Sequence, residues 1–100
     1  MIDIYTQPSC TWCDMVKSLF TKSGLIENED YKFRDIVESE EDCKFIVNVL
    51  GAKSVPVVVS NGTVIMGYKP VAIAEVINER IRDNDALEWA GVDENGRWLH

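Results

Sequence analysis

Apolar and polar residues alternate along this chain with two different periods, and the changes of period mark its expected elements. Residues 2–6 are β-branched or apolar on both sides, which is typical of a central strand. Residues 31–36 alternate apolar with polar, which predicts a strand with one buried face. The apolar runs 56–60 and 63–66 flank Asn61-Gly62, the strongest short-range signal for a β-hairpin.

Three other stretches have the 3.6-residue period of helices. Residues 11–24 place apolar side chains at helical spacing, namely Trp12, Met15, Val16, Leu19 and Phe20. Residues 39–51 begin with the N-cap signal of Ser39 and predict a second helix, whose apolar stripe is Phe45, Ile46, Val49 and Leu50. A third helix is expected to follow Pro70 and to run over residues 71–82, with an apolar side made of Ile73, Val76, Ile77 and Ile81.

The predicted order of elements is therefore β-α-β-α-β-β-α. A strand, a crossover helix and a second strand form a parallel pair, and the hairpin extends such a sheet in antiparallel fashion. We therefore predict an α/β domain over residues 1–82, with a four-stranded mixed sheet and helices on both of its faces. Residues 83–100 have no sustained period and form a C-terminal extension. Its Trp89 and Trp98 leave three readings open, namely a frayed tail, packing against the domain or contact with a partner.

Length and charge narrow the function classes. One hundred residues make one domain, and 17 acidic against 10 basic residues give a net charge of -7. Such a chain should be repelled by nucleic acid and by anionic membrane surfaces, so we expect neither as a partner. The sequence has no signal-peptide pattern and no apolar run of membrane-spanning length. We expect a cytoplasmic monomer.

The chemistry is concentrated in Cys10-Thr11-Trp12-Cys13, where the first strand gives way to the first helix. A thiolate at a helix N-terminus faces unpaired backbone N–H groups and the positive end of the helix dipole. The pKa of such a thiol is therefore expected below the ~8.5 of a free cysteine. Cys10 is the better candidate for that position. Cys13 lies one turn further on, within reach of a mixed disulfide formed on Cys10, which is the geometry that thiol–disulfide exchange needs.

Two other readings of the cysteine pair are weaker. Zinc requires four ligands, and the rest of the chain offers only Cys43 and His100, so we predict no metal site. A permanent structural disulfide that closes so short a loop would stabilise the fold little. Redox chemistry is therefore the favoured reading. Cys43 is unpaired and is expected to be a small side chain in the second helix.

Three segments together resemble the glutaredoxin family: residues 5–13, which end in the cysteine pair, Ser54-Val55-Pro56, and Gly67-Tyr68. The resemblance covers residues 1–82 and implies a thioredoxin-like fold. It also implies that Cys10 is the nucleophile and Cys13 the resolving cysteine. The Val55–Pro56 bond is then expected to be cis, with the Val55 backbone free to pair with an extended cysteinyl peptide.

Two positions depart from the usual glutaredoxin pattern. Gln7 stands where the family usually has a basic residue that holds a glutathione carboxylate. Gly67-Tyr68-Lys69-Pro70 stands where the family usually has two glycines followed by an aspartate, so Lys69 is expected to repel the glutathione amine. The Gly-aromatic-basic-Pro pattern is similar to the NrdH-redoxins. That similarity implies a hydrogen donor for ribonucleotide reductase, recharged by a thioredoxin-reductase-type flavoprotein, with Trp12 and Tyr68 as an aromatic rim beside Cys10.

We therefore predict a glutaredoxin-like thiol–disulfide oxidoreductase that reduces protein or mixed disulfides by a dithiol mechanism, with no bound cofactor. Its reductant is expected to be either glutathione or the flavoprotein. The predicted catalytic residues are Cys10 and Cys13, and the predicted substrate-binding residues are Gln7, Thr11, Trp12, Ser54, Val55, Pro56, Gly67, Tyr68 and Lys69. The alternative is a carrier of an iron–sulfur cluster or of zinc, with Cys10 as a ligand at a dimer interface.

Overall fold

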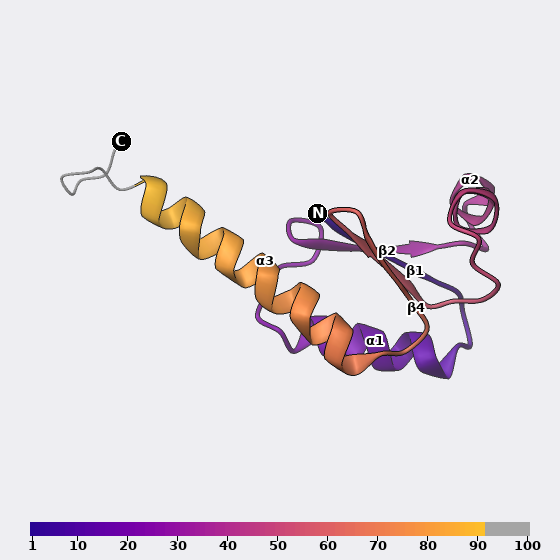
Figure 1. The fold of residues 1–100 in the computed structure, drawn as a ribbon. Coiled ribbons are helices and arrows are strands. Elements are labelled where there is room, and N and C mark those ends of the chain that lie inside the picture. Colours follow the sequence, from indigo (N-terminus) through magenta and orange to yellow (C-terminus); the bar gives the residue numbers. More distant parts are fainter. Residues whose placement is uncertain (92–100) are drawn as a thin grey trace.

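The computed structural model describes residues 1–91, and the side chains of residues 1–85. Figure 1 shows a twisted sheet with helices on its two sides and a last helix that extends beyond it. The elements are, in chain order, β1 (Ile2–Thr6), α1 (Thr11–Thr21), β2 (Tyr31–Asp35), α2 (Glu40–Lys44), the π-helix η1 (Phe45–Val49), β3 (Val57–Ser60), β4 (Thr63–Met66) and α3 (Pro70–Gly91). The predicted order is confirmed, with the addition of the π-helical turn.

The sheet has the strand order β2-β1-β3-β4. β1 is central, as its two-sided apolar pattern predicts, and it pairs in parallel with β2 and antiparallel with β3. β3 and β4 form the predicted antiparallel hairpin. Its turn residues Asn61 and Gly62 have φ values of 47 and 82°, which is the backbone that an Asn-Gly turn favours. Because of these directions, the end of β1, the start of β3 and the end of β4 lie at the same end of the sheet.

Two apolar clusters cover the two faces of the sheet, so the prediction of helices on both faces is confirmed. The larger one joins the sheet to α1 and α3, and it contains Ile2, Ile4, Val16, Phe20, Tyr31, Val58, Ile65, Ile73, Val76 and Ile77. The smaller one joins the other face to the α2 and η1 segment, and it contains Tyr5, Ile46, Ala52 and Val57. Figure 1 shows α1 and α3 on one side of the sheet and α2 on the other.

The buried side of α1 differs from its apolar pattern. Cys13, Val16 and Phe20 are buried, whereas Trp12 is 57% exposed and Met15 is 39% exposed. The spacing of three and four residues between the buried positions follows the true helical period, and Trp12 and Met15 fall beside it. Trp12 is therefore free to take part in a surface site.

The second helix is interrupted. Its N-cap is confirmed, because the Ser39 hydroxyl accepts a hydrogen bond from the Asp42 N–H at 3.2 Å. The predicted stripe is correct for buried Ile46 but wrong for Val49, which is 69% exposed. The cause is the π-helical turn, in which the N–H of Leu50 reaches back five residues to the carbonyl of Phe45. This wider turn rotates the residues that follow Ile46 away from the α-helical phase.

The last helix is longer than the sequence pattern predicts. The expected end at residue 82 is wrong, because α3 continues to Gly91. The apolar period ends near Arg82, but no glycine or proline interrupts the chain between Pro70 and Gly91, so nothing in the backbone stops the helix. The prediction of an extension over residues 83–100 therefore falls partly on helix. The side chains of Trp89 and Trp98 lie outside the described part, so the three readings of their role stay predictions.

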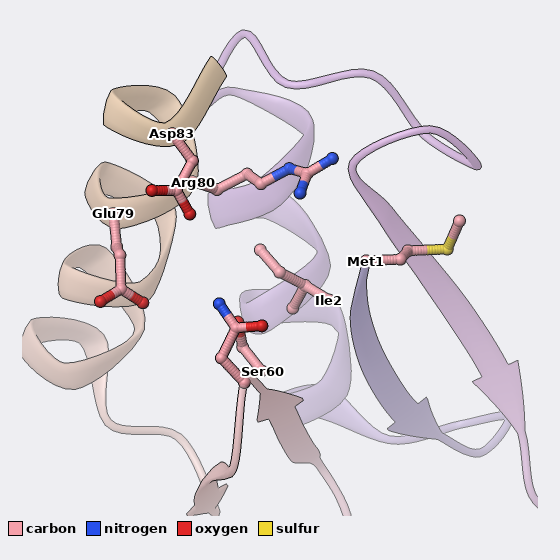
Figure 2. Close-up of a pocket in the computed structure, with 7 residues that line it drawn as sticks. Met1, Ile2, Ser60, Glu79, Arg80 and Asp83 are labelled. Atoms are coloured by element: carbon pink, nitrogen blue, oxygen red, sulfur yellow. The ribbon is translucent and has the colours of Figure 1, made fainter. Parts of the chain in front are cut away.

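One buried carboxylate fixes α3 to the start of β2. Asp30 accepts hydrogen bonds from the Ile26 N–H at 2.9 Å, from Arg80 Nε at 3.0 Å and from Asn84 Nδ2 at 3.2 Å. The bond from Ile26, together with those from Asn84 and Arg80, holds the pKa of Asp30 below its ordinary value, against the opposing effect of burial. Figure 2 shows Arg80 reaching from α3 across this end of the sheet, over a hollow of only ≈ 10 Å³. That volume is about one water molecule, so the space between Arg80 and the start of β1 is closed to a ligand.

Candidate functional site

Cys10 is the residue from which the site is built. It is the N-cap of α1, with extended backbone angles, and its Sγ accepts a hydrogen bond from the Cys13 N–H at 3.1 Å. At most N-caps an oxygen of Ser, Thr, Asp or Asn accepts this bond. Here a sulfur does so, and an N–H donor directed at it stabilises the thiolate form over the thiol. The arrangement confirms the predicted position of Cys10 at the start of the helix.

The two cysteines differ in exposure in the way that sequential thiol chemistry requires. Cys10 is partly exposed, whereas Cys13 is fully buried under the first turn of α1. Their Sγ atoms form a disulfide, and their Cα atoms are 5.1 Å apart. An incoming group can therefore reach Cys10 first, and Cys13 is positioned to react only with Cys10. Thr11, also a predicted site residue, is exposed as the first residue of α1.

The Ser54-Val55-Pro56 segment lies beside the cysteines because it leads into β3. Val57 pairs with Tyr5 near the end of β1, and Cys10 follows Tyr5 by five residues in the sequence. The Val55–Pro56 bond is cis, as expected. The Pro56 carbonyl accepts a hydrogen bond from the Gly67 N–H at 2.8 Å, which joins this segment to the end of β4.

The backbone of Val55 is left unpaired. Among the hydrogen bonds of the described residues, none uses its N–H or its carbonyl. Val55 as a residue is only partly buried. Backbone groups without a partner in the chain can pair with an extended peptide, as those of an exposed sheet edge do.

One hollow beside this segment is aromatic. It measures ≈ 230 Å³ and is lined by Trp12, Ser54, Val55, Pro56, Gly67 and Tyr68. We call it the aromatic groove. The rings of Trp12 and Tyr68 stack with their centroids 5.5 Å apart, so the predicted aromatic rim is present at the first turn of α1. Six predicted site residues thus come together from three separate parts of the chain.

A second hollow lies across the same segment. It also measures ≈ 230 Å³, and its walls are Gln7, Ile36, Ile46, Val47, Ala52, Lys53, Ser54 and Val55. We call it the apolar hollow. Gln7 therefore lies with the predicted residues Ser54 and Val55 but outside the aromatic groove. Lys69 lines neither hollow, although it is exposed next to Tyr68. The sequence analysis placed Ile46 in the apolar stripe of the second helix and gave Val47, Ala52 and Lys53 no role, because no local motif marks them.

Metal ligands do not gather elsewhere in the part of the chain described. The side chains of residues 1–85 form no cluster of three or more His, Cys, Asp or Glu that could hold an ion. The carrier alternative draws its ligands from a second chain and from glutathione, so it stays a prediction. Within the same residues, no helix is both long and apolar enough to cross a membrane.

The fold and the site define a thioredoxin-like protein with a redox-active cysteine pair at the start of its first helix. A family model for glutaredoxin matches residues 2–65. This chain belongs to the glutaredoxin family. Its predicted fold class and family are thereby confirmed.

Individual relatives agree with this assignment. The chain is 35% identical over 78 residues to the Gene 56 protein of Mycobacterium phage L5, covering 77% of this chain and 72% of the phage protein. It is 30% identical to an uncharacterized glutaredoxin-like 8.6 kDa protein in the rubredoxin operon of Clostridium pasteurianum, covering 79% of this chain and 100% of that protein. Among solved structures, the glutaredoxin-like NrdH-redoxin from Escherichia coli has the same fold, with a TM-score of 0.65 and 21% identity over 75% of this chain and 92% of that one.

Proposed function

We propose that this protein is a thiol–disulfide oxidoreductase that reduces disulfides of other proteins by a dithiol mechanism. The observation that carries the proposal is the Cys10 sulfur. The Cys10 residue is partly exposed at the N-cap of α1, its Sγ receives an N–H bond from Cys13, and it forms a disulfide with the buried Cys13. A cysteine acts as a nucleophile at neutral pH when its thiolate form is stabilised and the substrate can reach it.

The reaction has two steps. The Cys10 thiolate attacks one sulfur of the substrate disulfide, so a Cys10–substrate bond forms and the other substrate sulfur leaves as a thiolate. Cys13 then loses its proton and attacks Cys10 Sγ, which forms the Cys10–Cys13 disulfide and releases the second substrate sulfur as a thiolate. Two electrons pass to the substrate, and an external reductant must return two electrons to the protein.

The site favours a flavoprotein of the thioredoxin-reductase type as that reductant. Glutathione binding needs partners for its two charged ends, and Gln7 and Lys69 are the exposed residues at the positions where the family usually supplies them. A neutral amide holds a carboxylate more weakly than a cation does, and an ammonium repels the amine of glutathione. Reduction by glutathione is the competing possibility within the same mechanism.

Ribonucleotide reductase is the target that we propose. The proposal is supported by Gly67-Tyr68-Lys69-Pro70, whose pattern is similar to that of the NrdH-redoxins, and by the stacked ring of Trp12 against this segment. The E. coli NrdH-redoxin is itself described as glutaredoxin-like with a thioredoxin-like activity profile. We propose the same division for this chain, with a glutaredoxin fold and a thioredoxin-like choice of partners.

Serine substitutions test the mechanism. Cys10→Ser should lower turnover of a disulfide substrate by at least about 10³-fold, because the nucleophile is lost. Cys13→Ser should instead accumulate a mixed disulfide on Cys10, which intact-mass measurement detects. Cys43→Ser is the matched control, since Cys43 is partly buried in α2 and outside the site, and it should behave as the wild type. Retained turnover in Cys10→Ser would overturn the mechanism.

A separate assay tests the reductant. The oxidised protein is incubated with either glutathione or NADPH and thioredoxin reductase, and the appearance of the two thiols is followed. We expect reduction by the flavoprotein to be at least about tenfold faster at equal reducing capacity. Faster reduction by glutathione would exclude the proposed reductant without affecting the roles of Cys10 and Cys13.

A further inference from the structure

The aromatic groove and the apolar hollow lie on opposite faces of the sheet but share one wall. Ser54 and Val55 line both of them. Tyr68, in the aromatic groove, packs against the cluster under α1 and α3. Ile46, in the apolar hollow, belongs to the cluster under α2 and η1. A chain that passes along Val55 therefore has one cavity above it and one below it.

An extended peptide matches this arrangement. The unpaired N–H and carbonyl of Val55 can bind such a peptide as an added strand, and successive side chains of a strand point to opposite faces. Cys10 lies at the start of α1, on the face of the aromatic groove. A substrate cysteine that reaches Cys10 must point to that face, so the residues next to it in the substrate point toward the apolar hollow.

The walls of the apolar hollow indicate which side chain fits. Ile36, Ile46, Val47 and Ala52 are apolar, and Val47 is 50% exposed at its rim. Covering such surface with an apolar side chain is favourable by the hydrophobic effect, whereas a small polar side chain gains nothing there. A branched aliphatic residue also suits a volume of ≈ 230 Å³ better than a serine does.

Charge adds a second preference. The chain as a whole has a net charge of -7, yet among the residues that line the two cavities there is no carboxylate, and Lys53 is the one charged side chain. Lys53 is exposed and has no ion-pair partner within the described part of the chain. A free ammonium beside the bound segment attracts an acidic residue and repels a basic one.

We propose that the apolar hollow is a substrate subsite that selects an aliphatic residue next to the reacting cysteine, and that Lys53 favours acidic residues in the same segment. The substrate class is then an extended, acidic protein segment in which the disulfide cysteine has an aliphatic neighbour. This inference rests on the proposed dithiol mechanism and adds the determinant of its specificity.

Two peptide disulfides test the hollow. Each is a dimer of identical peptides joined through their single cysteine, with valine on both sides of the cysteine in one and serine in the other. The protein, reduced beforehand, is mixed with each, and the second-order rate constant for release of peptide thiol is measured. We expect the valine peptide to react about tenfold faster, since one well-placed aliphatic side chain is worth roughly that factor.

A pair of neighbouring valines supplies the matched variants. Val47→Asn should reduce the preference for the valine peptide to about threefold or less, because Val47 lines the hollow. Val49→Asn should leave it unchanged, because Val49 is 69% exposed in the same π-helical segment and lines neither cavity. Equal rates for the two peptides, or equal effects of the two substitutions, would overturn the subsite.

The charge preference has its own arm. Two further peptides carry aspartate or lysine on the outer side of each valine. The wild type should reduce the acidic peptide about fivefold faster than the basic one, and Lys53→Glu should reverse this order. Lys32→Glu, on the exposed edge of β2, should leave the order unchanged. A preference that is insensitive to Lys53 would exclude its role. If the protein reduces no peptide disulfide faster than free cysteine does, the proposed function itself fails. Equal and rapid reduction of all the peptides would overturn the subsite alone.

Discussion

At one end of β1 the Asp30 carboxylate is buried and hydrogen-bonded on both of its oxygens, whereas at the other end Cys10 is partly exposed and the segment that leads into β3 lines two cavities. The hollow under Arg80 at the first end measures ≈ 10 Å³, whereas each of the two cavities at the second end measures ≈ 230 Å³. The same strands form both ends. The two ends differ in whether their polar groups have hydrogen-bond partners within the chain.

The difference separates stability from function. Asp30, Arg80 and Asn84 satisfy one another, so they fix α3 and offer nothing to a ligand. The Val55 backbone makes no hydrogen bond within the described residues, and the Trp12 ring is largely exposed, so both are available to bind another molecule. Substitutions at the closed end should therefore change the free energy of unfolding, and substitutions at the open end should change the rate of disulfide exchange.

The largest effect on stability is expected from Asp30→Ala. It removes a carboxylate whose side chain is 10% exposed and leaves Arg80 without its partner, so we expect a loss of about 2–3 kcal/mol in the free energy of unfolding. Urea or thermal unfolding measures this loss. The rate of disulfide exchange, measured well below the melting temperature, should stay within about twofold of the wild type.

Asp83→Ala is the matched control for that substitution. Asp83 lies on α3 at the same hollow, as Figure 2 shows. It is exposed and takes no part in the hydrogen bonds around Asp30. Its removal should change stability by less than about 0.5 kcal/mol. If the two substitutions cost the same, the hydrogen-bonded carboxylate is not what closes this end of the sheet.

A smaller effect should appear in acid. The pKa of Asp30 is lowered in the folded protein, so its charged form stabilises the fold at any pH above its ordinary value of 3.8. That contribution is lost as the pH falls through the lowered value. Unfolding measured between about pH 5 and pH 2 should show a steeper loss of stability in the wild type than in Asp30→Asn. Parallel curves for the two proteins would mean that Asp30 ionises alike in both states.

The order and pairing of the elements could be predicted from the sequence because each depends on a local period. Alternation in β2, the Asn61-Gly62 turn and the Ser39 cap each act over a few residues. The π-helical turn could not be predicted in this way, and neither could the continuation of α3. The π turn has no local sequence signal, and only the structure shows that its Ile46 belongs to the buried cluster. The apolar period of α3 ends near Arg82 although no glycine or proline stops the helix there, and the contact of Asn84 with Asp30 joins residues distant in the sequence.

The site shows the same division. Cys10 and Cys13 were predicted because two thiols occur at a characteristic spacing where a strand gives way to a helix. The Trp12–Tyr68 rim was predicted from the resemblance of the Gly67-Tyr68-Lys69-Pro70 pattern to the NrdH-redoxins. The wall of the apolar hollow was missed because Ile46 and Val47 carry no chemical signal of their own. Only the fold shows that one of them is buried and the next is at a rim. Subsites made of ordinary aliphatic residues are visible only in three dimensions.

Two aromatic pairs allow the smallest and sharpest comparison. Trp12 and Tyr68 stack at 5.5 Å at the open end, and Phe20 and Tyr31 lie at 5.2 Å within the core. Trp12→Ala should cost less than about 1 kcal/mol of stability, because the ring is 57% exposed, yet it should slow disulfide exchange by about three- to tenfold. Phe20→Leu should do the reverse, with a loss of about 1–1.5 kcal/mol and an unchanged rate. If Trp12→Ala destabilises the protein as much as Phe20→Leu does, the Trp12 ring stabilises the fold as a core residue would, and its proposed role in a substrate-binding surface is contradicted.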